Sequence, residues 1–463
     1  MRLLNTTTLE FANFFDTKHL SYAILSHRWG ADEVTYEQFL LTQSTDDLLT
    51  RREALQAATV KRYAGYAKIL NFCAFAQRLG HQYCWVDTCC IDKRSSAELT
   101  EAINSMWTWY AQATICFVYL ADVADWRDTQ ALDAAFRASE WFNRCWTLQE
   151  LLAPEDLLFV THSWSPFLRF VKSRTLDRIG ACKYLDRSQG YINALDSLVN
   201  ASRVPNDVLL GGRHGLRNAC IAEKMHWAAH RQATRAEDVA YSLLGLFEIN
   251  MPLLYGEGDR AFMRLQHEII RQVSDETIFA WQAPRCGTSP YCHAQTKLIL
   301  ASHPSAFIHS ARTLRSRIDD DRTILVPMHQ SIFRERETPF QLTNRGLLMT
   351  VVPRIITKQL NGSGEWLNWL IIPLMCFPSN YTERQCEMIL KVGNIFTTEG
   401  STPGTGGITV VSRVGACRTI ASPDHLPSEL VPADLEEAEQ LEQTLRIFAP
   451  IGLPGEPELR FGP

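Results

Sequence analysis

A chain of 463 residues is longer than one ordinary domain, and 46% hydrophobic with 21% charged residues is typical of globular domains that each bury a core. The 46 basic and 51 acidic residues give a net charge of −5, which argues against nucleic acid as a partner. The most apolar run, residues 366–377, is about a dozen residues long and is interrupted by Asn368 and Pro373, so no membrane span is expected.

The amino-terminal residues and the cysteines indicate in which cellular compartment the protein is expected. The opening MRLLNTTTLEF has neither a sustained apolar stretch nor a small-residue cleavage site, so it does not predict a secretory signal. The 13 cysteines include no C-x-x-C pair and lie within apolar patterns. We therefore expect reduced core cysteines and a cytoplasmic protein.

The first third of the chain alternates helical and strand patterns. Its strand segments are apolar on both faces, which is typical of a parallel sheet covered by helices on both sides. The first expected helix stops before Gly80, where we expect the left-handed cap that glycine favours. The expected strands are residues 22–25, 83–87, 114–120 and 157–161, and the expected helices are residues 58–79, 97–113 and 140–152.

The pattern changes twice farther along the chain. From about residue 162 it becomes helical and polar, and beyond Trp281 short β-type runs are separated by glycine-rich turns. The sequence therefore predicts an α/β domain at residues 1–161, a helical extension at 162–282 and a β-rich domain at 283–463.

Polar side chains follow the expected strands, where the ligands of open parallel sheets bind. Ser26, His27 and Arg28 come after the first strand, and Asp87 ends the second. Glu150 belongs to the expected helix 140–152, where Trp146 lies four residues before it and would share its face. These residues, together with Trp29, are the candidate site.

Each candidate also has a structural interpretation. Ser26 could cap the following turn, His27 could be a hydrogen-bonded core histidine, and Arg28 could form a buried ion pair with Asp87. Asp87 could instead cap a loop, and Glu150 is either a paired structural acid or a poised one. No metal site is expected, because Cys286, Cys292 and His293 lack a second pair of ligands.

Three long motifs resemble a known family. "YAILSHRWG", "YCWVDTCCIDKRSSAELTEAINSMWTWYAQATICFVYLADV" and "RCWTLQELLAPEDLLFV" together resemble the fungal heterokaryon-incompatibility (HET) domain, and the resemblance extends over residues 1–282. It implies a fungal, intracellular protein of nonself recognition, whose HET domain triggers growth arrest and programmed cell death when incompatible cells fuse. Its partner would be an incompatibility protein or further copies of itself.

A shorter resemblance concerns mechanism. "YAILSHRWGADEVTYEQF" and "CWTLQEL" are similar to motifs of Toll/interleukin-1 receptor (TIR) domains, which have a flavodoxin-like α/β fold. In the TIR enzymes that cleave NAD, the glutamate four residues after the tryptophan is catalytic. The resemblance implies this role for Glu150, with NAD as a substrate and no resident cofactor.

The remaining candidates then acquire roles around that nucleotide. Arg28 would bind pyrophosphate or ribose oxygens, and Ser26 and His27 would hydrogen-bond the nucleotide. Trp29 or Trp146 would stack on a ring, and Asp87 is a further ligand-binding candidate. The alternative is a non-enzymatic signalling module that assembles or recruits a partner through exposed apolar surface on helix 97–113.

Overall fold

The computed structural model describes residues 1–44, 50–126, 128–172, 181–185, 194–281, 300–308 and 310, and beyond these it describes the backbone of strands β9 to β20. The chain folds into two compact units. Unit 1 comprises Met1–Ala219 and Arg231–Tyr255, and unit 2 comprises Cys220–His230 and Gly256–Pro463. The cysteine and histidine candidates for a metal, at 286, 292 and 293, lie outside the described residues.

Unit 1 is built on an eight-stranded sheet of order β2-β1-β4-β3-β5-β6-β7-β8. Its four central strands, β4, β3, β5 and β6, are parallel, and the strands on either side are antiparallel. The α/β fold expected from the sequence is confirmed, although the sheet is mixed at its edges. The strands are β1 Arg2–Asn5, β2 Phe11–Asn13, β3 Tyr22–His27, β4 Tyr83–Trp85, β5 Ile115–Tyr119, β6 Asp156–Val160, β7 Pro166–Val171 and β8 Ala181–Tyr184.

The order of the parallel strands indicates where a ligand would bind in a fold of this kind. Counted along the chain, they lie in the order second, first, third, fourth, which is the beginning of the flavodoxin-like arrangement. The direction of winding reverses between β3 and β5, which pair from Ala23 with Ile115 to His27 with Tyr119. Open α/β sheets bind ligands beyond the carboxyl ends of the strands at this reversal.

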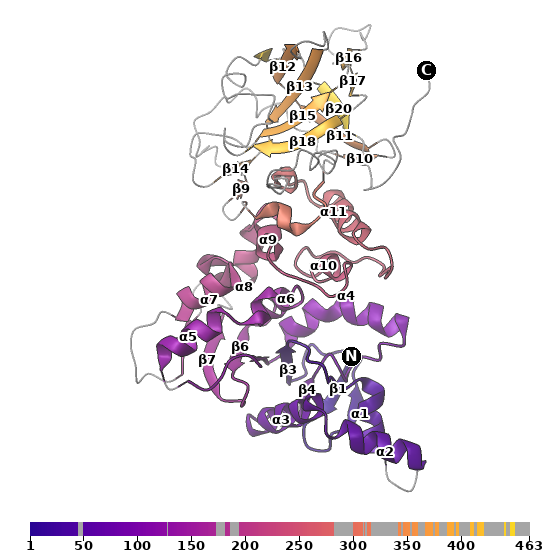
Figure 1. Cartoon of the computed structure of the whole chain (residues 1–463), viewed down its shortest axis with the longest axis vertical. Helices are drawn as coiled ribbons and strands as arrows, with labels where there is room; N and C mark the ends of the chain where they lie inside the picture. The colour runs from indigo at the N-terminus through magenta and orange to yellow at the C-terminus, as the bar shows by residue number, and fades with distance from the viewer. Residues whose placement is uncertain are drawn as a thin grey trace. The chain divides into compact units, whose positions relative to one another are not determined.

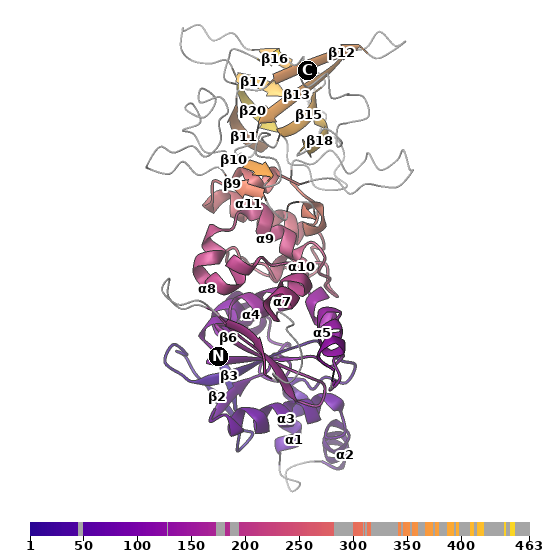
Figure 2. The ribbon, with the colours of Figure 1, turned by 90° about the vertical axis from the view of Figure 1, so that its left-hand side faces the viewer.

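Helices cover both faces of the sheet. In Figures 1 and 2, α3 lies on one face and α4 on the other. All six residues of β3 are buried, because the strand is central and both of its faces are covered. The helices of unit 1 are α1 Tyr36–Gln43, α2 Arg51–Val60, α3 Ala64–Arg78, α4 Ser96–Gln112, α5 Thr129–Arg137, α6 Thr147–Leu152, α7 Ala194–Ser202, α8 Asn206–Asn218 and α10 Asp238–Tyr241.

Local sequence signals explain several helix ends. Thr35 and Gln38 form a capping box at the start of α1, and Thr50 and Glu53 form one at the start of α2. After α3, Gly80 has φ +86°, so the glycine cap expected from the sequence is confirmed.

Several predicted boundaries were wrong. The helix expected at 58–79 is two helices, α2 and α3, and the second strand ends at Trp85 because the Val86 carbonyl accepts the Cys90 N–H in a turn. The helix expected at 140–152 is a 3-10 turn, Glu140–Asn143, followed by α6. The chain is extended between them because Asn143 O and Cys145 N bond the backbone of Gln232. Strands β7 and β8 fall in the region predicted to be helical.

Unit 2 contains α9 Ile221–Ala228 and α11 Arg260–Gln272, with 3-10 turns at Glu276–Phe279 and Pro304–Phe307. The β-rich character predicted beyond residue 283 is confirmed, as the strands form two five-stranded sheets, β10-β11-β20-β17-β16 and β18-β15-β13-β12-β19, and the pair β14-β9. These strands are β9 Thr313–Arg315, β10 Gln341–Thr343, β11 Gly346–Val351, β12 Arg354–Gln359, β13 Trp366–Pro373, β14 Cys376–Pro378, β15 Glu387–Val392, β16 Ile395–Thr397, β17 Ile408–Val411, β18 Val414–Ile420, β19 Glu439–Gln440 and β20 Leu445–Ala449.

Two further expectations concern helices and thiols. None of the helices in the described part of the chain is both long enough and apolar enough to cross a bilayer. The cysteines whose side chains are described are free thiols, and all of them except the half-exposed Cys182 are buried. Their burial agrees with the expected reduced core residues.

Candidate functional site at the carboxyl end of β3

Ser26 and Glu150 meet inside unit 1. The Ser26 hydroxyl donates to Glu150 Oε2 at 2.5 Å and accepts the indole N–H of Trp141 at 2.8 Å. Ser26 is fully buried and Glu150 is 8% exposed. The fold thus brings a carboxyl group from α6 to the carboxyl end of β3, as the sequence predicted for Glu150 and Ser26.

Burial controls the charge of Glu150. Removal from water is the largest influence and raises the pKa of this carboxyl group to about 8, and the negative charge of Asp87 acts in the same direction. Hydrogen bonds with Ser26 and Tyr110 and the charge of Arg144 lower the pKa but do not compensate. Glu150 is therefore mainly protonated at neutral pH.

His27 lies on the opposite face of β3, because consecutive strand residues point to opposite sides. Its side chain is 1% exposed, and its Nε2 lies 3.8 Å from Glu33 Oε2 and 3.7 Å from Asp87 Oδ1. Neither ring nitrogen has a hydrogen-bond partner in the structure. Burial, and then the charges of Lys68 and Lys93, lower its pKa well below the ordinary value, so His27 is neutral.

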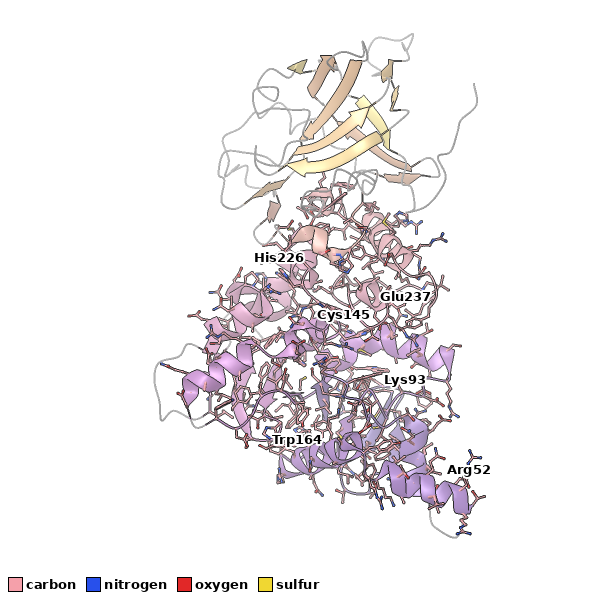
Figure 3. The ribbon with its side chains drawn as sticks, in the orientation of Figure 1. Arg52, Lys93, Cys145, Trp164, His226 and Glu237 are labelled. Carbon is pink, nitrogen blue, oxygen red and sulfur yellow. The ribbon has the colours of Figure 1, made fainter. Side chains whose placement is uncertain are left out.

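Asp87 also binds Trp29, which lies at the edge of the cluster formed by His27, Glu33 and Asp87. The Trp29 indole N–H donates to Asp87 Oδ2 at 2.7 Å, and Lys93 Nζ lies 3.5 Å from the centre of the same ring. Figure 3 labels Lys93, which precedes the first turn of α4. Burial raises the pKa of the Asp87 carboxyl group. The charge of Lys93 and the hydrogen bond from Trp29 lower this pKa, and the charge of Glu33 raises it further.

Two predicted site residues lie differently from expectation. Arg28 is exposed and forms no ion pair with Asp87, since the chain has left the sheet one residue earlier. Trp146 directly precedes α6 with helical backbone angles, and its carbonyl accepts the Glu150 N–H at 3.4 Å, but its side chain hydrogen-bonds Asp238. The tryptophan that bonds the Ser26–Glu150 pair is Trp141, through the Ser26 hydroxyl.

Three further members of the site were missed by the sequence analysis. Glu33 bonds Lys68 Nζ at 2.5 Å and the Gly30 N–H at 2.7 Å, and Tyr110 donates its hydroxyl to Leu25 O at 2.9 Å. Glu33 lies in a loop and Lys68 on α3, so no motif links them. A charged residue on the buried face of an amphipathic helix was the available signal, and Lys68 is 9% exposed.

Gly65 fixes the loop that carries Glu33. Its N–H donates to Asp32 O at 3.1 Å, and a Cβ at this position would lie 2.4 Å from that oxygen and 2.9 Å from Glu33 Cα. We expect Gly65→Ala to lower the free energy of unfolding by about 1–3 kcal/mol, because the loop must move. Urea unfolding measures this. Gly211→Ala on α8, where a Cβ meets nothing within 4 Å, is the control, and an equal effect of the two changes would contradict the account.

The apolar surface predicted on helix 97–113 is not observed. Ala102, Ile103, Met106 and Tyr110 of α4 are buried, and none of the large apolar side chains exposed in the described residues lies on this helix. The helix packs its apolar residues against the sheet, so it offers no such interface.

Two family models match parts of the chain. Residues 22–135 match the family model of the heterokaryon incompatibility protein (HET). The chain carries a HET domain. The match includes Ser26 to Trp29 and Asp87 and ends before Trp146 and Glu150. Residues 260–383 match a domain of unknown function, DUF8212.

One relative aligns with a longer part of the chain than the HET family model does. The vegetative incompatibility protein HET-E-1 of Podospora anserina is 40% identical over 257 residues, which are 54% of this chain and 16% of that protein. The chain therefore spans a small part of the length of this relative. No solved structure matches the chain, and the similarity of its HET domain to TIR domains stays a prediction.

Proposed function

We propose that this chain acts in fungal heterokaryon incompatibility and triggers cell death through a nucleotide site at the carboxyl end of β3, where NAD is cleaved. The HET domain and the likeness to an incompatibility protein support the first part. The observation that carries the second is Glu150, a buried carboxyl group with a raised pKa beside the reversal of strand order.

The proposed cleavage of NAD requires only one carboxyl group from the protein. The bond between ribose C1′ and the nicotinamide nitrogen breaks, its electron pair leaves with neutral nicotinamide, and water adds to C1′ and releases a proton. Positive charge develops on the sugar, and a carboxylate stabilises it as in glycoside hydrolysis. Since the leaving group needs no proton, one carboxyl group is sufficient.

Substrate binding would prepare Glu150 for this role. The nicotinamide ring of NAD is positively charged, and a cation near a carboxyl group lowers its pKa. Glu150, protonated in the free protein, would then ionise when the substrate is in place. Ser26 and Trp141 would hold the side chain in position, as they do in the structure.

Nicotinamide release tests the proposal. Purified protein is incubated with NAD, both dilute and crowded, because TIR-like enzymes are often activated by assembly. We expect Glu150→Gln to reduce release by on the order of 100-fold, since the amide cannot become an anion. Glu101→Gln, an exposed change on α4, is the control with the same chemistry.

The alternative is a non-enzymatic module that self-assembles or recruits a death partner. It is favoured by the closed Ser26–Glu150 pair and by the exposed position of Arg28, which is not drawn into the site. Wild type and Glu150→Gln are each expressed in cells, and the fraction of cells that die is measured. Equal cell death with the two proteins would support this alternative and would contradict NAD cleavage as the cause of death.

A further inference from the structure

Polar atoms without partners surround one point on the α3 side of β3. Both ring nitrogens of His27 and Glu33 Oε2 are buried without a hydrogen bond, and the bond from Trp29 to Asp87 uses Oδ2 and leaves Oδ1. Glu33 Oε2 and Asp87 Oδ1 lie 3.8 and 3.7 Å from the same nitrogen of His27, too far for hydrogen bonds. A buried polar group without a hydrogen bond is destabilising, and a ligand that supplied these bonds would remove that cost.

The charges of the cluster restrict that molecule. Its open atoms are two carboxylate oxygens and a neutral imidazole, so a ligand must bring hydrogen-bond donors. Lys68 and Lys93 already supply two positive charges, which disfavours a cation. The described residues include no group of three or more His, Cys, Asp or Glu that could hold a metal ion. Neutral hydroxyl donors fit best.

We propose that Glu33, Asp87 and His27 form a subsite for the vicinal diol of a nucleotide ribose. Two adjacent hydroxyls would donate to Glu33 Oε2 and Asp87 Oδ1, and a hydroxyl oxygen or proton would meet His27 Nε2. Carboxylates bind ribose hydroxyls in the same way in dinucleotide-binding sheets. The inference rests on the proposed nucleotide site and specifies which part of the nucleotide these residues hold.

Two surface residues border the subsite. Trp29 is 46% exposed, and Lys93, which contacts its ring, is exposed as well. Exposed side chains change rotamer within nanoseconds, so these two can admit a ligand without a change of fold. Once displaced from Asp87, the Trp29 ring is free to cover the ligand.

Ligand pairs that differ by one hydroxyl test the subsite. The probes are AMP with 2′-deoxy-AMP, and nicotinamide mononucleotide with its 2′-deoxy counterpart, titrated calorimetrically into the full chain. We expect at least one ribonucleotide to bind about 10-fold more tightly than its deoxy form, because the deoxy form lacks one hydrogen bond to a charged group. Asp87→Asn should weaken the binding of the ribonucleotide, because a neutral amide oxygen replaces the charged acceptor of one hydroxyl.

Asp92→Asn is the matched control, because it removes the same charge from the same loop at a side chain that binds Arg94 instead. Should Asp87→Asn fail to fold, the ¹⁵N shifts of His27 in wild-type protein replace it, and they should respond to the ribonucleotide and not to the deoxy form. Equal binding within both pairs, with NAD still cleaved, overturns the subsite alone. No binding of any probe, with no nicotinamide release, overturns both proposals.

Discussion

Lys172→Met is expected to lower the free energy of unfolding by more than about 3 kcal/mol. Lys172 is 3% exposed, and its Nζ donates to the carbonyl oxygens of Leu151, Leu152 and Pro154 at 2.6, 2.7 and 2.6 Å. Leu151 and Leu152 end α6, where the carbonyls of the last turn have no partners within the helix, and Pro154 follows its C-cap. Methionine has a similar length but no donor, so three buried acceptors would lose their partner.

Urea unfolding measures this cost. Lys183→Met on the neighbouring strand β8 removes the same charge from an exposed side chain and should change the stability by no more than about 0.5 kcal/mol. Because α6 is short and carries Glu150, Lys172→Met should also loosen the Ser26–Glu150 pair. A variant as stable as Lys183→Met would show that the capping contacts contribute little.

The sequence predicted those elements whose signals are local. The buried strand β3, the glycine cap after α3 and the apolar face of α4 all follow from patterns within a few residues. The break before α6 depends instead on backbone bonds between residues 143–145 and Gln232, almost ninety positions away. No local pattern contains that contact, so the sequence suggested one continuous helix.

The candidate site shows the same division. Strand ends indicated Ser26, His27 and Asp87, because the topology of a parallel sheet places strand ends together. Which side chains they meet depends on the helices that cross each face, so Trp141, Glu33 and Lys68 were missed. The sequence placed Arg28 in the site, but a charged residue directly after a strand can turn either into the site or into water. In the structure Arg28 is exposed.

The pH dependence of stability should reveal the protonated Glu150. Its pKa is raised from an ordinary 4.5 to about 8, chiefly by burial, so between these values the folded state holds a proton that the unfolded state has lost. The unfolded state then binds fewer protons, and stability falls as pH rises, by about 1.4 kcal/mol per pH unit. Glu150→Gln removes this slope, because glutamine does not titrate.

The difference between wild type and Glu150→Gln isolates this one group. The pKa of His27 is lowered in the fold, so this residue makes stability rise with pH below its ordinary pKa of 6.5. Burial lowers the pKa of Lys172 to about 7, so this residue makes stability rise with pH above 7. Both residues contribute equally in wild type and in Glu150→Gln. Urea unfolding at pH 5, 6 and 7 should therefore show the wild type losing stability relative to Glu150→Gln, while Glu101→Gln follows the wild type. A constant difference across these three pH values would mean that Glu150 is ionised in the fold, and that Ser26 and Tyr110 outweigh its burial.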